Sequence, residues 1–324
     1  MMKRMGIGLL VILVAVMGMQ MGILASEVQD VVRVGSLKGP TSMGLSKMMQ
    51  DHEGGEGYAF MVAGVPDEVA PLLAKGEIDI ALIPCNLAAV LHQKMGGGLQ
   101  VAAVNTLGVL YVVEEGESVQ TVADLAGQTM LSTGKGTTPE YTLNYVLRQN
   151  GLEPGADVMI DYRSEATEVL AAMTGGVAKL AMLPQPFVTA ALAQNPNLRV
   201  ALSLTEAWDA LGSDGALVTG VVAVRKAFAQ ERPEALAAFM EEYAASTAYV
   251  NEHPAEIAPY IEALGIAKAA VAEKAIPASN IVCIAGEEMQ RMVSGYLNVL
   301  YEENPQSVGG ALPDEAFYIA NVAK

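Results

Sequence analysis

The sequence predicts an α/β protein made of two similar units in tandem, each a mostly parallel sheet flanked by helices. Short runs rich in β-branched residues alternate with helical patterns across residues 31–106 and again across residues 128–204. Two apolar strands of a different kind, Thr106–Glu114 and Ala216–Arg225, each contain one glycine and follow these two series. Because strands that alternate with helices build parallel sheets, we expect two helix-covered sheets.

In the first unit, four expected strands alternate with three expected helices. The strands are Val31–Leu37, Tyr58–Ala63, Ile78–Pro84 and Gln100–Thr106, and the helices are Ser42–Gln50, Asp67–Lys75 and Asn86–Lys94. In the second unit, the strands are Gln128–Leu131, Val158–Tyr162, Leu180–Leu183 and Leu198–Leu204, and the helices are Pro139–Asn150, Glu165–Gly175 and Gln185–Gln194. The chain then becomes almost wholly helical, over Pro233–Asn251, Pro254–Leu264, Ala267–Ala275 and Gly286–Asn304, with a short insert at Asn280–Ile284. We expect this last part to return to the first unit.

The two glycine-containing strands are interpreted as crossings between lobes, with Gly108 and Gly220 absorbing the bends. The alternative is that both are central core strands. With crossings, the expected organisation is a signal peptide at residues 1–26, lobe 1 at residues 27–107 and 222–324, and lobe 2 at residues 108–221.

The N-terminus has the pattern of a secretory signal. Lys3 and Arg4 precede an apolar run from Met5 to Leu24, and two small residues follow. The alternative is an uncleaved anchor, since the run is nearly long enough to span a bilayer. We expect export to the periplasm or the extracellular face of the membrane, without a lipid-anchor cysteine, because the first cysteine is Cys85. Whether Cys85 pairs with Cys283 stays open.

Composition excludes several classes of protein. The formal net charge of −17 and the lack of a basic stripe argue against a nucleic-acid partner, and 52% hydrophobic residues argue against disorder. The three histidines, His52, His92 and His253, lie among polar helical neighbours without a second ligand at metal-binding spacing. We interpret them as solvated, and we expect no metal, no cofactor and no catalytic residue.

A glycine-rich turn at residues 134–136 precedes a helix that opens with Thr137 and Pro139. The N–H groups of that turn and of the first helical turn, together with Lys135, would form a cradle for an anion or a polar ligand. The alternative is an ordinary strand-to-helix connection. The phosphate loop of NTPases is excluded, because Gly136 stands where that motif requires Ser or Thr.

Similar turns follow other expected strands, and ligands of open parallel sheets bind beyond the carboxyl ends of strands. Each turn combines proline or glycine with a hydrogen-bonding side chain, although plain helix capping also explains such residues. The candidate ligand-binding residues are Lys38, Thr41, Ser42, Asn86, Thr106, Gly134, Lys135, Gly136, Thr137, Thr138 and Gln185.

Four segments carry a family resemblance: Lys-Gly-Pro-Thr at 38–41, GEIDIALIPCNLAAVL at 76–91, VADLAGQTM with its following turn and helix at 122–147, and GGVAKLAMLPQPFVTAAL at 175–192. They resemble the periplasmic solute-binding proteins of ABC importers, in the type II branch of aliphatic-sulfonate, taurine, nitrate and thiamine-pyrimidine binders. The resemblance covers Val31 to Phe317.

This resemblance implies a two-lobe type II periplasmic-binding-protein fold with two crossover strands. It also implies a monomer that captures a small polar or anionic solute and delivers it to a membrane permease with its ATPase, and that is not an enzyme. The expected turns contain no arginine, which weakens the case for a strongly anionic ligand. Tyr141 or Trp208 could stack on a ring of the ligand. The alternative is an enzyme on the same fold that acts on a small metabolite.

Overall fold

The structure is a computed structural model that describes residues 31–55, 57–212 and 215–319. The expected signal peptide, residues 1–26, lies outside these residues. No helix within the described ranges combines the length and the apolar character needed to cross a membrane.

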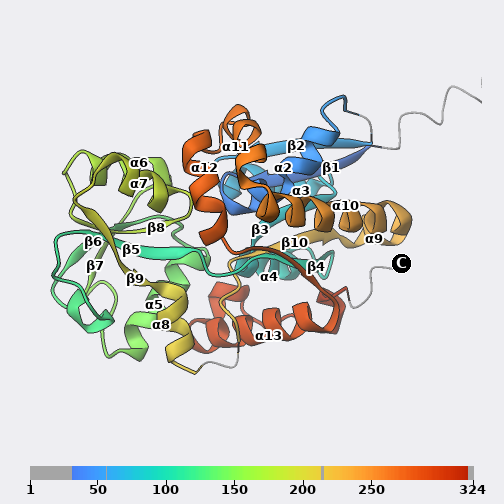
Figure 1. Cartoon of the computed structure of the whole chain (residues 1–324). Coiled ribbons are helices and arrows are strands. Elements are labelled where there is room, and N and C mark those ends of the chain that lie inside the picture. The colour runs from blue at the N-terminus through green and yellow to red at the C-terminus, as the bar shows by residue number, and fades with distance from the viewer. Residues whose placement is uncertain (1–30, 56, 213–214, 320–324) are drawn as a thin grey trace, which may run out of the picture.

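Strands from both ends of the described chain form the larger of two sheets, which we call sheet A (Figure 1). Its order is β11-β4-β10-β3-β1-β2. Strand β1 pairs in parallel with β2 and β3, whereas β10 runs antiparallel to both β3 and β4. The bounds are β1 Val32–Leu37, β2 Tyr58–Ala63, β3 Ile80–Pro84, β4 Leu99–Thr106, β10 Gly220–Arg225 and β11 Ile281–Ala285. Helices α2 (Pro40–Asp51), α3 (Pro66–Lys75) and α4 (Cys85–Lys94) connect its early strands.

The smaller sheet, sheet B, has the order β7-β6-β8-β5-β9. Its strands are β5 Leu110–Glu115, β6 Thr129–Ser132, β7 Met159–Tyr162, β8 Leu180–Pro184 and β9 Leu198–Ser203. Its helices are α5 Thr138–Gln149, α6 Ala166–Thr174, α7 Phe187–Gln194 and α8 Leu204–Ala210. Below, lobe 1 means sheet A with its helices and lobe 2 means sheet B with its helices. The predicted α/β fold with two helix-flanked sheets is therefore confirmed.

The chain passes between the lobes twice. It leaves sheet A after Thr106 and enters sheet B at Leu110, and it re-enters sheet A at Gly220. The expected strand Thr106–Glu114 is thus interrupted at residues 107–109, because the backbone N–H of Leu107 bonds Asn280 instead of continuing a ladder. The exact lobe boundaries stay a prediction.

The C-terminal helices pack mainly on lobe 1, as α10 does against α2. They are α9 Lys226–Glu231, α10 Pro233–Glu252, α11 Pro254–Ala263, α12 Ala269–Ala275 and α13 Gly286–Glu303. Short 3₁₀ helices occur at η1 Val122–Leu125, η2 Ile276–Ala278, η3 Pro305–Val308 and η4 Glu315–Phe317.

One apolar cluster continues from lobe 1 into lobe 2. The ring of Trp208 on α8 lies 5.5 Å from that of Tyr296 on α13 and 4.8 Å from that of Tyr145 on α5. The hydroxyls of Tyr296 and Thr142 are 3.2 Å apart, and the indole N–H of Trp208 donates to the carbonyl oxygen of Gly215 at 2.7 Å. We call Thr142, Tyr145, Trp208 and Tyr296 the lobe bridge.

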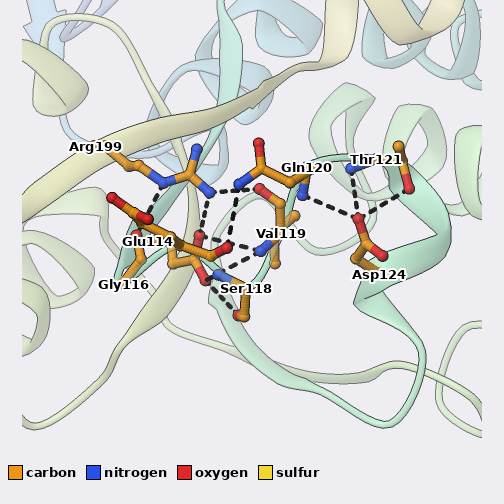
Figure 2. A network of polar contacts seen from close by, with 9 residues as sticks. Glu114, Gly116, Ser118, Val119, Gln120, Thr121, Asp124 and Arg199 are labelled. Atoms are coloured by element: carbon orange, nitrogen blue, oxygen red, sulfur yellow. Dashed lines mark hydrogen bonds and ion pairs between the residues drawn. The ribbon is translucent and has the colours of Figure 1, made fainter.

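A polar network braces the end of sheet B that lies away from the carboxyl ends of β6 and β8 (Figure 2). The buried carboxylate of Glu114 contacts the guanidinium of Arg199 at 2.7 Å and accepts hydrogen bonds from the N–H groups of Ser118 and Val119. Burial alone would raise the pKa of Glu114, but the hydrogen bonds from Ser118 and Val119 and the charge of Arg199 outweigh it and lower that pKa. Glu114 therefore stays ionised and holds the loop before η1.

Two further details concern the cysteines and His92. Cys85 and Cys283 are free thiols. The interpretation of His92 as solvated is wrong, because its side chain is buried, bonds the carbonyl oxygen of Leu99 through Nδ1 at 2.6 Å, and packs edge-on against Phe317. The residues that follow it, Gln93 and Lys94, are polar, but the C-terminal segment around Phe317 folds over it.

Candidate functional site

A cavity of about 260 Å³ lies between the lobes, at the carboxyl ends of the parallel strands of both sheets. Turns after β1, β2 and β3 supply its lobe 1 wall, and turns after β6, β7 and β8 supply its lobe 2 wall. The crossings contribute residues 106, 109, 110, 219 and 220. Its polar lining residues are Lys38, Thr41, Thr106, Thr133, Thr137, Thr138, Ser164, Glu165, Thr167, Gln185 and Thr219.

The structure brings seven of the predicted ligand-binding residues together on this cavity: Lys38, Thr41, Thr106, Gly134, Thr137, Thr138 and Gln185. They come from both lobes and from one crossing. Ser42, Asn86, Lys135 and Gly136 do not line it. Tyr141 and Trp208 are not lining residues either, and Trp208 is fully buried in the lobe bridge.

Ser42 and Asn86 fall behind the wall because their polar atoms are used inside the protein. The buried Ser42 hydroxyl donates to the carbonyl oxygen of Leu37 at 2.6 Å. The Asn86 amide donates to the carbonyl oxygens of Ser307 at 3.1 Å and Gly136 at 3.5 Å, and its Oδ1 accepts from the Thr138 hydroxyl at 3.2 Å. Asn86 thus connects lobe 1 to the start of α5.

The glycine-rich turn is not the open cradle that its sequence suggests. The N–H of Gly136 donates to the carboxylate of Glu140 at 2.5 Å, and the N–H of Thr137 donates to the carbonyl oxygen of Gly134 at 3.0 Å. Glu140 therefore occupies the place of an external anion at Gly136. Lys135 points to the ring of Tyr162, with Nζ 6.0 Å from the ring centroid. Gly134 must be glycine, since its φ is +75° and a Cβ would lie 2.7 Å from the Pro139 ring.

Most of the hydroxyl groups predicted to bind ligand already donate within the protein. Thr41 donates to the carbonyl oxygen of Leu37 at 2.6 Å, and Thr137 donates to that of Gly134 at 2.7 Å. Gln185 accepts through Oε1 from the Thr189 hydroxyl at 2.8 Å, which leaves its NH₂ group as a donor. These side chains can still accept hydrogen bonds from a ligand.

Two charged side chains of opposite sign line the cavity within the described residues, and both are exposed. Lys38 follows β1 in lobe 1, and Glu165 precedes α6 in lobe 2. Glu165 reaches toward lobe 1, because one of its carboxylate oxygens lies 3.7 Å from the place a Cβ would occupy on Gly64. Opposite charges therefore stand at the rim, whereas the deeper walls carry hydroxyl and apolar groups. No group of three or more His, Cys, Asp or Glu residues suited to a metal occurs among the residues the structure describes.

The profile of a family described as menaquinone biosynthesis matches residues 40–278, which include most of the residues that line this cavity. The chain belongs to the menaquinone-biosynthesis family. No curated protein matches the chain significantly.

Solved structures similar to this family member include periplasmic binding proteins. An ABC transporter protein from Parabacteroides distasonis is 26% identical with a TM-score of 0.74, over 90% of this chain and 99% of that chain. The periplasmic aliphatic sulphonate binding protein SsuA from Escherichia coli is 19% identical with a TM-score of 0.69, over 87% and 90%. The alkanesulfonate-binding protein SsuA from Xanthomonas axonopodis pv. citri, bound to MOPS, is 18% identical with a TM-score of 0.65, over 90% and 96%. The predicted resemblance to type II solute-binding proteins is confirmed.

Membership of the menaquinone-biosynthesis family corrects one expectation. The expectation that the chain is not an enzyme is wrong, because the family is described by a biosynthetic role and so points to an enzyme. A fold that binders and enzymes share does not decide between them.

Sequence reasoning missed the lining residues that follow the second strand of each unit, including Gly64, Ser164, Glu165 and Thr167. Their strands, β2 and β7, are edge strands of the two sheets. The sequence does carry a signal at these positions: Pro66 and the polar residues 164–165 have the same character as the turns from which the candidate ligand-binding residues were taken. The order of strands in a sheet is not written in the sequence, so the position of these turns beside the cavity was not foreseen.

Proposed function

We propose that this family member captures a small solute between its two lobes as the extracytoplasmic substrate-binding protein of an ABC importer. One observation carries the proposal: a single cavity of about 260 Å³ is walled by both lobes and by both crossings. Its volume is near the lower end for small-molecule sites, which suits a compact ligand. A site shared by two lobes couples ligand binding to their relative position.

The ligand we propose is a small polar or anionic solute, of the sulfonate, nitrate or pyrimidine kind. Support comes from the relatives described as aliphatic-sulfonate-binding and nitrate-binding proteins. Lys38 supplies one positive charge at the rim, and the NH₂ group of Gln185 is a hydrogen-bond donor on the wall.

Delivery to a membrane permease and its ATPase, by an exported monomer with a signal at residues 1–26, is part of the same proposal. The relatives described as periplasmic support this location. A bound solute would draw the lobes together, and the closed protein would then present to the permease a surface that differs from that of the empty protein.

A second candidate function is supported by the family match: an enzyme that acts on a small metabolite in the same cavity. Among the described lining residues, Lys38 and Glu165 are the two charged side chains, so they are the candidates to transfer a proton or to hold a charged intermediate. The Glu165 carboxylate also accepts a hydrogen bond from the Thr167 hydroxyl at 3.0 Å, which orients it at the start of α6.

Calorimetry with taurine, MOPS, nitrate and thymine as probes tests the binding proposal, and X-ray scattering of the same samples tests lobe closure. We expect one probe to bind with one-to-one stoichiometry and to reduce the radius of gyration. Val65→Trp, which fills the rim of the cavity, should abolish this binding. Val177→Trp is the matched control, because Val177 is 85% exposed and is not a lining residue.

Two outcomes count against the proposal. Equal affinity in the Val65→Trp and Val177→Trp variants would place the binding elsewhere. Conversion of a probe by wild-type protein, lost in Glu165→Gln while binding persists, would establish the enzyme instead.

A further inference from the structure

Two buried hydroxyl groups on the cavity have no hydrogen-bond partner. Thr106 is 1% exposed and Thr219 is partly buried, and the Oγ1 atoms of both are shielded from solvent and unpaired. They are adjacent, because the backbone N–H of Thr219 donates to the carbonyl oxygen of Thr106 at 3.0 Å. Both line the cavity. We call this pair the cavity floor.

The floor differs from three other threonines on the wall. Thr41, Thr137 and Thr138 each donate to an oxygen of the protein, so their protons are already committed. A buried hydroxyl without a partner costs about 1–3 kcal/mol, and such groups are uncommon in folded proteins unless a ligand or water completes them. A bound molecule that reaches the floor would therefore complete hydrogen bonds that the protein leaves unmade.

A third unpaired polar group lies beside the floor. The Asn105 side chain is 0% exposed, and neither its Nδ2 nor its Oδ1 has a partner. Its Oδ1 lies 2.4 Å from where a Cβ on Gly220 would be, and Thr41 lies 3.3 Å from that same point. Gly220 and Thr41 both line the cavity, whereas Asn105 itself does not, so its amide lies behind this part of the wall, next to the floor. Taken together, the three side chains offer donors and acceptors, whereas a deprotonated oxyanion can only accept.

No charged side chain belongs to this group of three, and the charged lining residues Lys38 and Glu165 are exposed at the rim. An ion buried at the floor would lose its hydration without gaining a counter-charge, which is strongly unfavourable. Apolar residues, among them Val109 and Leu110, continue the wall beside Thr106.

From this arrangement we infer that the floor binds an uncharged head group that both donates and accepts hydrogen bonds, such as a carboxamide or lactam, on an apolar body. The inference rests on the proposed binding function and selects the ligand class within it. Any charge on the ligand faces Lys38 or Glu165 at the rim. The neutral pyrimidine-like solutes fit this class, and compact oxyanions do not.

Calorimetry with benzamide, benzoate and benzenesulfonate tests the ligand class, because the three share one apolar ring and differ in the head group. We expect benzamide to bind most tightly. Thr106→Val and Thr219→Val each remove one hydroxyl at nearly constant shape and should weaken benzamide binding about two- to twelvefold. Thr106→Ser keeps the hydroxyl and should restore most of the affinity.

A second measurement needs no ligand. The double variant Thr106→Val/Thr219→Val removes two unpaired hydroxyls, so its melting temperature should rise by about 2–4 °C or more above that of wild type. Thr41→Val is the matched control: it breaks the bond to the Leu37 carbonyl and should lower the melting temperature.

The inference is overturned if benzenesulfonate binds as tightly as benzamide, if benzamide does not bind at millimolar concentration, or if the double variant melts below wild type. If benzenesulfonate binds as tightly as benzamide and draws the lobes together, the proposed binding function stands, but the inference that the floor selects an uncharged head group is refuted. The two failures are therefore distinguishable.

Discussion

Replacement of Trp208 by alanine should destabilise the protein strongly, because this side chain occupies the lobe bridge. It is the only tryptophan in the sequence and is 0% exposed. Its ring packs against Tyr145 from lobe 2 and Tyr296 from lobe 1, and its indole N–H bonds the carbonyl oxygen of Gly215. Truncation would remove these contacts and leave a cavity where α5, α8 and α13 meet.

The expected loss follows from comparable truncations. Removal of a fully buried Trp or Phe side chain costs about 3–5 kcal/mol in the free energy of unfolding. Trp208→Phe keeps an aromatic ring but leaves the Gly215 carbonyl without its donor, so it should cost about 1–3 kcal/mol. The ordering of the two variants is thus fixed: alanine costs more than phenylalanine.

Urea unfolding followed by far-ultraviolet circular dichroism measures these losses, since both variants lack the fluorescent indole. Met159→Ala is the control, because Met159 is 52% exposed on β7 and its truncation should change stability by less than about 0.5 kcal/mol. A loss below about 1 kcal/mol for Trp208→Ala would refute the reasoning and would mean that the bridge contributes little.

Three further predictions concern the sheet B network, Gly220 at the start of β10, and the thiols. Glu114→Gln should lower the free energy of unfolding by about 1.5–3 kcal/mol near neutral pH. Because the pKa of Glu114 is lowered in the folded state, the greater stability of the wild type should disappear as the pH falls through that pKa. A difference in urea midpoints that stays unchanged at acidic pH would contradict this. Gly220→Ala should lower stability by about 1–3 kcal/mol, because its Cβ would lie 2.4 Å from Asn105 Oδ1, and calorimetric melting checks it. Burial raises the pKa of Cys283 to about 11 and also raises that of the fully buried Cys85, so iodoacetamide at pH 7.5 should label neither thiol rapidly until the protein is unfolded, as mass spectrometry would show.

The elements of the fold were largely predictable because strands and helices differ in hydrophobic period. The expected helix Pro254–Leu264 differs from α11 by one residue, and the expected strand Tyr58–Ala63 is identical to β2. Helix α8 was not foreseen. It begins after Ser203, whose side chain accepts from the N–H of Glu206 at 3.3 Å, and this cap was read as the end of a strand.

The site was predictable only as far as single turns reveal it. Strand ends with proline or glycine led to the turn that carries Lys38 and Thr41 and to Gln185 after β8, and these residues line the cavity. Asn86 has the same local signature, yet its amide is turned away by the carbonyl oxygen of Ser307, more than two hundred residues along the chain. Thr219 has no turn signature, and only the pairing of β4 with β10 places it beside Thr106.

The lobe bridge makes the two edges of the cleft unequal. On one edge, α13 meets α5 and α8 through large buried rings; on the other, α12, a short alanine-rich helix, meets α7 (Figure 1). Widening of the cleft should therefore pivot near Tyr296 and displace α12 from α7 the most. Larger side chains on α12 would slow arrival and departure of a solute together, so its residence time would lengthen while its equilibrium affinity stayed almost unchanged.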